Sequence, residues 1–149
     1  MRDFKVPNKF LITAAALSGL AALIHVGCIY FGAPWYRFFG AGEQMATMAE
    51  AGSWIPGAMT AGIAAVLTIW ALYALSGAGV VRRLPLIRTA LCVITAIYLL
   101  RGLAAVPMAV LHPQDTTAFV WWSSAICFGF GLFHLVGLRQ RWRALSVAA

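Results

Sequence analysis

"FLITAAALSGLAALIHVGCIYFGA", residues 10–33, decides the fold class of this chain. The stretch carries no charged side chain, and about 20 apolar residues are enough for a helix to cross the hydrocarbon core of a bilayer. Three further apolar runs of similar length follow it, at residues 54–77, 84–111 and 118–138. Four such runs predict an all-α integral membrane protein built as a bundle of four transmembrane helices.

The composition of the whole chain agrees with this class. Apolar residues make up 62% of the 149 residues and charged residues only 10%, whereas a typical soluble domain has about 25% charged residues. The runs leave no room for a separate soluble domain, so we expect one membrane domain over residues 1–149 with a tail at 139–149. A signal peptide is the alternative for the N-terminus, but residues 10–33 are long for its apolar part, and we expect a retained first helix.

The basic residues are concentrated on one side of the expected bundle. If the runs cross the membrane in turn, nine of the 11 Lys and Arg residues fall on the side of the termini: Arg2, Lys5, Lys9, Arg82, Arg83, Arg88, Arg139, Arg141 and Arg143. Because basic residues favour the cytoplasmic side, the pattern predicts a bacterial-type inner-membrane protein with both termini in the cytoplasm. Topology and lipid headgroups account for the net charge of +7, and nucleic-acid binding finds no support.

Two places in the sequence predict departures from four straight helices. Residues 34–53 open with "PWYRFFGAG", whose aromatic residues are of the types that settle at a membrane interface, and continue with a helix-forming composition. We expect a short interfacial or re-entrant helical segment there, with a plain surface loop as the alternative. Pro107, near the end of the third run, predicts a kink in that helix.

A single arginine interrupts the third run in "AIYLLRGLAAVP", residues 96–107. At a helical rise of 1.5 Å per residue, Arg101 lies roughly 18 Å into a core of about 30 Å. An arginine at such a depth costs about 2.5–3.5 kcal/mol on insertion scales, so it should face the bundle interior with a partner. Glu43 is the first choice, ahead of Glu50 and Asp115, because the glycines before Glu43 would let its segment fold inward.

Polar side chains at a level similar to that of Arg101 occur in all four runs. His25 lies about 22 Å into the core when counted along the first run, and Tyr98 is one helical turn from Arg101. Thr60 in the second run and Ser123 and Ser124 in the fourth fall at a similar level. We therefore expect an outward-facing polar pocket with these ligand-binding residues: Arg101, His25, Glu43, Tyr98, Thr60 and Ser124.

This pocket supports three interpretations. Arginine beside a titratable histidine suits an anionic group, so the first is a protein that binds or transports an anionic or amphipathic small molecule or lipid. The second is a small integral-membrane enzyme acting on a lipid-soluble substrate, with His25, Glu43 and Tyr98 as acid–base candidates. The third is a packing or assembly subunit in which Arg101 only locks the helices. Since so short a chain does not easily enclose a transport path across the membrane alone, we expect a homodimer or higher oligomer, with membrane lipids as partners.

Cofactor and metal chemistry finds less support. His25 and His134 fall at different depths in their runs, so a haem held by two histidines would need distortion. The potential metal ligands have no short spacing that would concentrate them: His25, His112, Glu43 and Asp115. The three cysteines fall in three different runs without a C-x-x-C pair. We therefore expect neither a cofactor nor a metal ion.

The length and the four-helix outline are similar to those of the small multidrug-resistance exporters. Members of that family carry a glutamate inside the first helix, where this sequence has His25 and no acidic residue. The chain contains no motif by which this resemblance would assign individual residues, and none is assigned.

Overall fold

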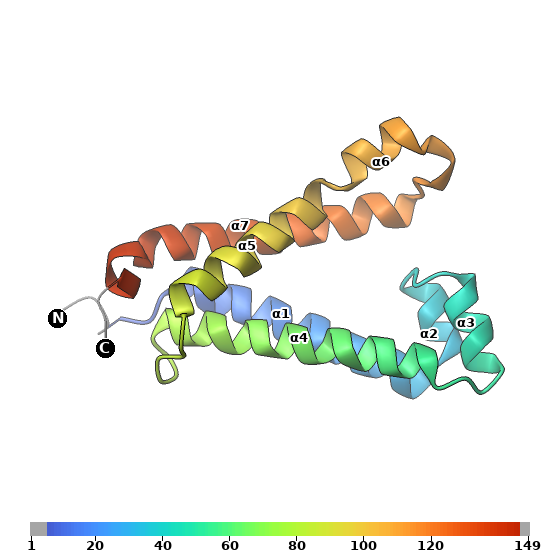
Figure 1. The fold of residues 1–149 in the computed structure, drawn as a ribbon, viewed down its shortest axis with the longest axis horizontal. Coiled ribbons are helices and arrows are strands. Elements are labelled where there is room, and N and C mark those ends of the chain that lie inside the picture. The colour runs from blue at the N-terminus through green and yellow to red at the C-terminus, as the bar shows by residue number, and fades with distance from the viewer. Residues whose placement is uncertain (1–5, 147–149) are drawn as a thin grey trace. The chain divides into compact units, whose positions relative to one another are not determined.

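The computed structural model describes residues 6–146, and every regular element in that part of the chain is a helix (Figure 1). Within residues 6–146, four helical segments are long and apolar enough to cross a membrane. They are α1 (Lys9–Phe31), α4 (Ile55–Ala78), the pair α5 (Ile87–Leu103) and α6 (Ala105–Leu111), and α7 (Ala118–Ser146). The predicted all-α class with four apolar helices is confirmed, and these helices suggest a multi-pass membrane protein. Their assembly into one bundle stays a prediction.

The last helix extends further than the sequence predicts. α7 continues to Ser146, through most of the expected tail at 139–149. Arg83 donates from Nη2 to the carbonyl of Leu145 at 2.6 Å, and the guanidinium of Arg88 lies 3.6 Å from the ring centre of Trp142. Cations close to the C-terminal carbonyls stabilise a helix end, which explains why the basic tail is helical.

The third apolar segment is broken near Pro107, as predicted. Proline has no N–H to donate to the carbonyl of Leu103, four residues earlier, and its ring clashes with that carbonyl. Next to this missing bond, the N–H of Ala104 bonds to the carbonyl of Arg101, three residues earlier, at 3.4 Å. The chain changes direction between α5 and α6 (Figure 1), and Arg101 is therefore in the last turn of α5. A 3-10 turn, η1 (Pro113–Asp115), then connects α6 to α7.

The connection after α1 contains two short helices, α2 (Ala33–Phe38) and α3 (Glu43–Glu50), so its predicted helical character is confirmed. Gly40 and Gly42, with φ of 68° and 97°, make the turn between them, because glycine adopts positive φ without steric cost. The two helices lie side by side (Figure 1) around the buried residues Tyr36 and Ala46. The interfacial or re-entrant position of this segment stays a prediction.

The chain divides into two compact units. The first unit holds Met1–Leu17 and Trp70–Ala149, and the second unit holds Ser18–Ile69. α1 and α4 each contribute to both units, whereas α5, α6 and α7 belong to the first, and α2 and α3 to the second. The expected single membrane domain stays a prediction.

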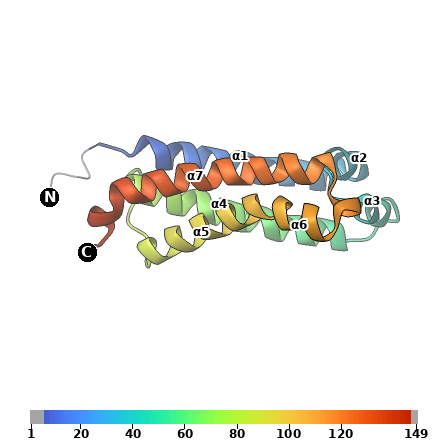
Figure 2. The same ribbon diagram turned by 90° about the horizontal axis from the view of Figure 1, so that it is seen from above.

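Close contact between α5 and α7 organises the first unit, where the two helices lie side by side (Figures 1 and 2). A Cβ added to Gly102 would lie 2.6 Å from the backbone N of Phe128. A Cβ added to Gly131 would lie 3.0 Å from the backbone N of Leu99. Glycine at these positions lets the two helix backbones approach each other without a side chain between them.

Candidate functional site

Two serine hydroxyls of α7 bind the guanidinium of Arg101. Nη1 donates to Ser124 Oγ at 2.9 Å and Nη2 donates to Ser123 Oγ at 3.1 Å. Ser124 is buried, whereas Arg101 is exposed. These three residues, all in the first unit, are called the Arg101–serine site below. The structure thus brings the predicted ligand-binding residues Arg101 and Ser124 together, and it adds Ser123.

The partners of Arg101 in this site are neutral. Asp115 is the acidic residue of the first unit within the described range, and it forms no ion pair with Arg101. Serine hydroxyls orient the guanidinium but do not cancel its charge, and they use only two of its five N–H donors. The end of α5 contributes a favourable field, since the C-terminal carbonyls of a helix carry partial negative charge.

Glu43, the first-choice partner of Arg101, is bound to a different arginine. Arg37, in α2, contacts Glu43 at the start of α3 and Glu50 at its end, with N–O distances of 2.6 Å to each. These hydrogen bonds hold the pKa of both carboxyl groups below its ordinary value and raise the pKa of Arg37. Pairing of Glu43 with Arg101 stays a prediction. The ion pair between Glu43 and Arg37, six residues earlier, argues against it.

Tyr98 is one turn from Arg101 on α5 but has different surroundings. It is 4% exposed, and its ring lies 4.9 Å from Trp70, 5.5 Å from Phe130 and 5.2 Å from His134, measured between ring centres. His134 is fully buried and its Nδ1 bonds to the carbonyl of Phe130 at 2.9 Å. Tyr98 is therefore part of an aromatic core in the first unit.

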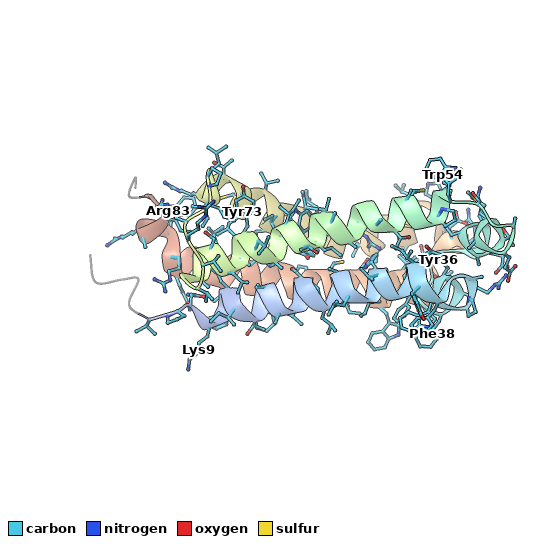
Figure 3. All side chains as sticks on the ribbon, turned by 90° about the horizontal axis from the view of Figure 1, so that it is seen from below. Lys9, Tyr36, Phe38, Trp54, Tyr73 and Arg83 are labelled. Carbon is cyan, nitrogen blue, oxygen red and sulfur yellow. The ribbon has the colours of Figure 1, made fainter. Side chains whose placement is uncertain are left out.

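The predicted residues of the second unit bond to their own neighbours. His25 Nδ1 lies 2.7 Å from the carbonyl of Ala21, one turn earlier on α1. Thr60 Oγ1 lies 3.2 Å from the hydroxyl of Tyr36, and both residues are buried. Tyr36 lies toward α4 whereas Phe38 projects outward (Figure 3). Thr60 and Tyr36 therefore join α4 to α2.

The six residues of the predicted pocket are divided between the two units. The first unit holds Arg101, Tyr98 and Ser124, and the second holds His25, Glu43 and Thr60. A single pocket that contains all six stays a prediction. The Arg101–serine site is the part of it that lies within one unit.

No protein family, curated protein or solved structure matches this chain.

Proposed function

We propose that this is a multi-pass membrane protein that binds the anionic group of an amphipathic small molecule or lipid at the Arg101–serine site. The observation that carries the proposal is the exposed guanidinium in an apolar helix, held by two neutral hydroxyls. A charge at this depth is costly without a counter-charge. A phosphate or carboxylate group supplies that counter-charge and accepts charge-assisted hydrogen bonds from arginine.

The serines prepare Arg101 for such a ligand. Ser123 donates its own hydroxyl proton to the carbonyl of Val120 at 3.2 Å, which turns its oxygen lone pairs toward Arg101. Because Ser123 and Ser124 are consecutive residues of one helix, they hold Nη1 and Nη2 together against α7. A guanidinium that is already oriented loses less side-chain entropy when an anion binds.

The experiment is native mass spectrometry of the full chain in a neutral maltoside detergent, with dodecyl phosphate as the probe. We expect Arg101→Gln to weaken binding roughly 10- to 100-fold, the amount that corresponds to losing one hydrogen-bonded charge. A Ser123→Ala/Ser124→Ala double variant keeps the charge but loses its orientation, so binding should weaken less.

Arg82→Gln is the matched control, because it removes an equal charge from the connection between α4 and α5. It should bind dodecyl phosphate as the wild type does. The proposal fails if Arg101→Gln retains the wild-type affinity, or if Arg82→Gln lowers the affinity as much as Arg101→Gln does.

The contacts favour binding over the enzymatic interpretation. Of the three acid–base candidates, His25 bonds to its own helix, Glu43 to Arg37, and Tyr98 packs in an aromatic core. Transport, as opposed to binding alone, would need the ligand to cross the bilayer, which uptake of dodecyl phosphate into liposomes containing the protein would measure. Without such uptake, binding remains the proposed function.

The proposal includes a location in a bacterial-type inner membrane, with both termini cytoplasmic, as a homodimer or higher oligomer. The basic residues near the start of α1 and the end of α7 support the orientation, and the short length of the chain is the reason for proposing an oligomer. Arg2 and Lys5, which contribute to the prediction, lie outside the described residues. Labelling of cysteines introduced at either end, from one side of the membrane, tests the orientation, and the mass of the native complex tests the oligomeric state.

A further inference from the structure

A pocket of about 770 Å³ lies where α1 begins and α7 ends. Residues 6–10 and 139–144 line it, and all of them belong to the first unit. Among residues 6–146, the lining has no acidic side chain and has these four basic ones: Lys9, Arg139, Arg141 and Arg143. This site is called the basic pocket below.

Hydrogen bonds and close packing hold one wall of the basic pocket. Arg141 is 6% exposed, and its Nη2 donates to the carbonyls of Val6 and Ala78. Asn8 donates from Nδ2 to Gln140 Oε1 at 2.7 Å, while its Oδ1 accepts the N–H of Leu11 at 2.9 Å and so caps α1. Val6 and Asn8 are therefore bonded to α7, and Arg141 of α7 also bonds to the end of α4.

Three cations of the basic pocket remain available to a ligand. Lys9, Arg139 and Arg143 are exposed, and no carboxylate of residues 6–146 forms an ion pair with them. Figure 3 shows Lys9 projecting from the first turn of α1. Because Arg141 donates to backbone carbonyls, we assign it a structural role in the wall of the pocket and not a role in binding the ligand.

An apolar surface continues from the cations along the same helices. Phe10, which lines the basic pocket, contacts Phe133 of α7 with 6.2 Å between ring centres, and both rings are partly exposed. α1 and α7 are both long and apolar enough to cross a membrane, so the pocket lies at the helix ends, where lipid headgroups meet a bilayer-spanning protein. A ligand that fits has an anionic head and an apolar tail.

We propose that the basic pocket binds the phosphodiester headgroup of an anionic phospholipid through Lys9, Arg139 and Arg143, with the acyl chains along Phe10 and Phe133. A phosphate oxygen accepts hydrogen bonds from both ammonium and guanidinium groups, and basic pockets at the ends of membrane helices suit such headgroups. The free phosphate ion shares this chemistry, but it has no apolar part that would contact the apolar surface beside the cations.

The test is native mass spectrometry of the full chain with phosphatidylglycerol and phosphatidylcholine of identical acyl chains. The ratio of the two bound lipids isolates the headgroup, because the chains are the same. The wild type should prefer phosphatidylglycerol, and each of Lys9→Gln, Arg139→Gln and Arg143→Gln should lower that preference about fivefold. Arg82→Gln, a charge change outside the basic pocket, should leave it unchanged.

Repeating the comparison in the Arg101→Gln background separates the two sites. The effect of the pocket variants should persist there, whatever the outcome at the Arg101–serine site. Three results would overturn the inference: an unchanged lipid ratio in all three pocket variants, an equal loss in Arg82→Gln, or binding of inorganic phosphate through the same cations with no preference between the lipids.

Discussion

Replacement of Gly102 tests the helix contact that supports the Arg101–serine site. A Cβ at this position would lie 2.6 Å from Cα, Cβ and N of Phe128. Cα and N are backbone atoms, so they cannot move aside without moving α7. Overpacking of this kind costs about 1–3 kcal/mol, while alanine in place of glycine in a helix favours folding by about 1 kcal/mol.

Gly129→Ala isolates the packing cost. No atom lies within 4 Å of a Cβ added to Gly129, so that variant should show only the gain in helix propensity. Gly102→Ala should therefore be less stable than Gly129→Ala by about 1–3 kcal/mol. The assay is unfolding of the full chain by sodium dodecyl sulfate in mixed micelles, followed by tryptophan fluorescence.

The same variant should weaken ligand binding, because Gly102 follows Arg101 directly and separation of α5 from α7 lengthens the bonds from Arg101 to the serines. Binding of dodecyl phosphate should fall in Gly102→Ala and stay at the wild-type level in Gly129→Ala. Equal unfolding midpoints for the two variants would contradict this prediction, since they would mean that α5 and α7 are not in backbone contact at Gly102.

Two further predictions concern the second unit. The bonds to Arg37 lower the pKa of Glu43 and Glu50 in the folded protein. They therefore stabilise the packing of α2 against α3 fully at pH values above the ordinary pKa of 4.5, and this stabilisation is lost as the pH falls through the lower folded-state pKa. Hydrogen exchange over residues 33–50, corrected for intrinsic rates, should increase at that low pH. Tyr36→Phe leaves the hydroxyl of Thr60 without its tyrosine partner, and should destabilise the chain by about 0.5–1.5 kcal/mol in the detergent unfolding assay.

Each of these predictions has a control in the same unit. Arg37→Gln should remove the acid dependence of exchange, and a drop in protection at the same pH in that variant would contradict the assignment to the ion pairs. Tyr30→Phe removes a hydroxyl from a side chain that is 84% exposed, so it should be neutral. A loss of stability in Tyr30→Phe as large as in Tyr36→Phe would argue against a specific contribution from the bond to Thr60.

The sequence predicted the class and the helices well because those depend on local properties. The length and polarity of residues 10–33 are enough to indicate a membrane-spanning helix, and the missing N–H of Pro107 is enough to predict the break that the structure has at Ala104. The helical form of the tail was less predictable. It depends on Arg83 and Arg88, which come from a distant part of the chain to contact the end of α7.

The partners of individual side chains could not be predicted in the same way. Counting residues along the runs places Ser124 at a similar level to Arg101, but it places several other polar residues there too, and it ranks every acidic residue on the outer side as a partner for Arg101. It gives no weight to Arg37, which is close to Glu43 in the chain and binds it at the exposed surface. Local pairing there needs no charge to enter an apolar environment.

The amino-acid sequence is enough to predict a helical chain with four segments long and apolar enough to cross a membrane, and with an arginine within the third of them. These features follow from composition and order along the chain. The packing of the helices determines which hydroxyls bind Arg101, and it makes Gly102, but not Gly129, a contact glycine. Those distinctions depend on which face of one helix meets another, and two glycines in apolar helices look alike until the helices pack.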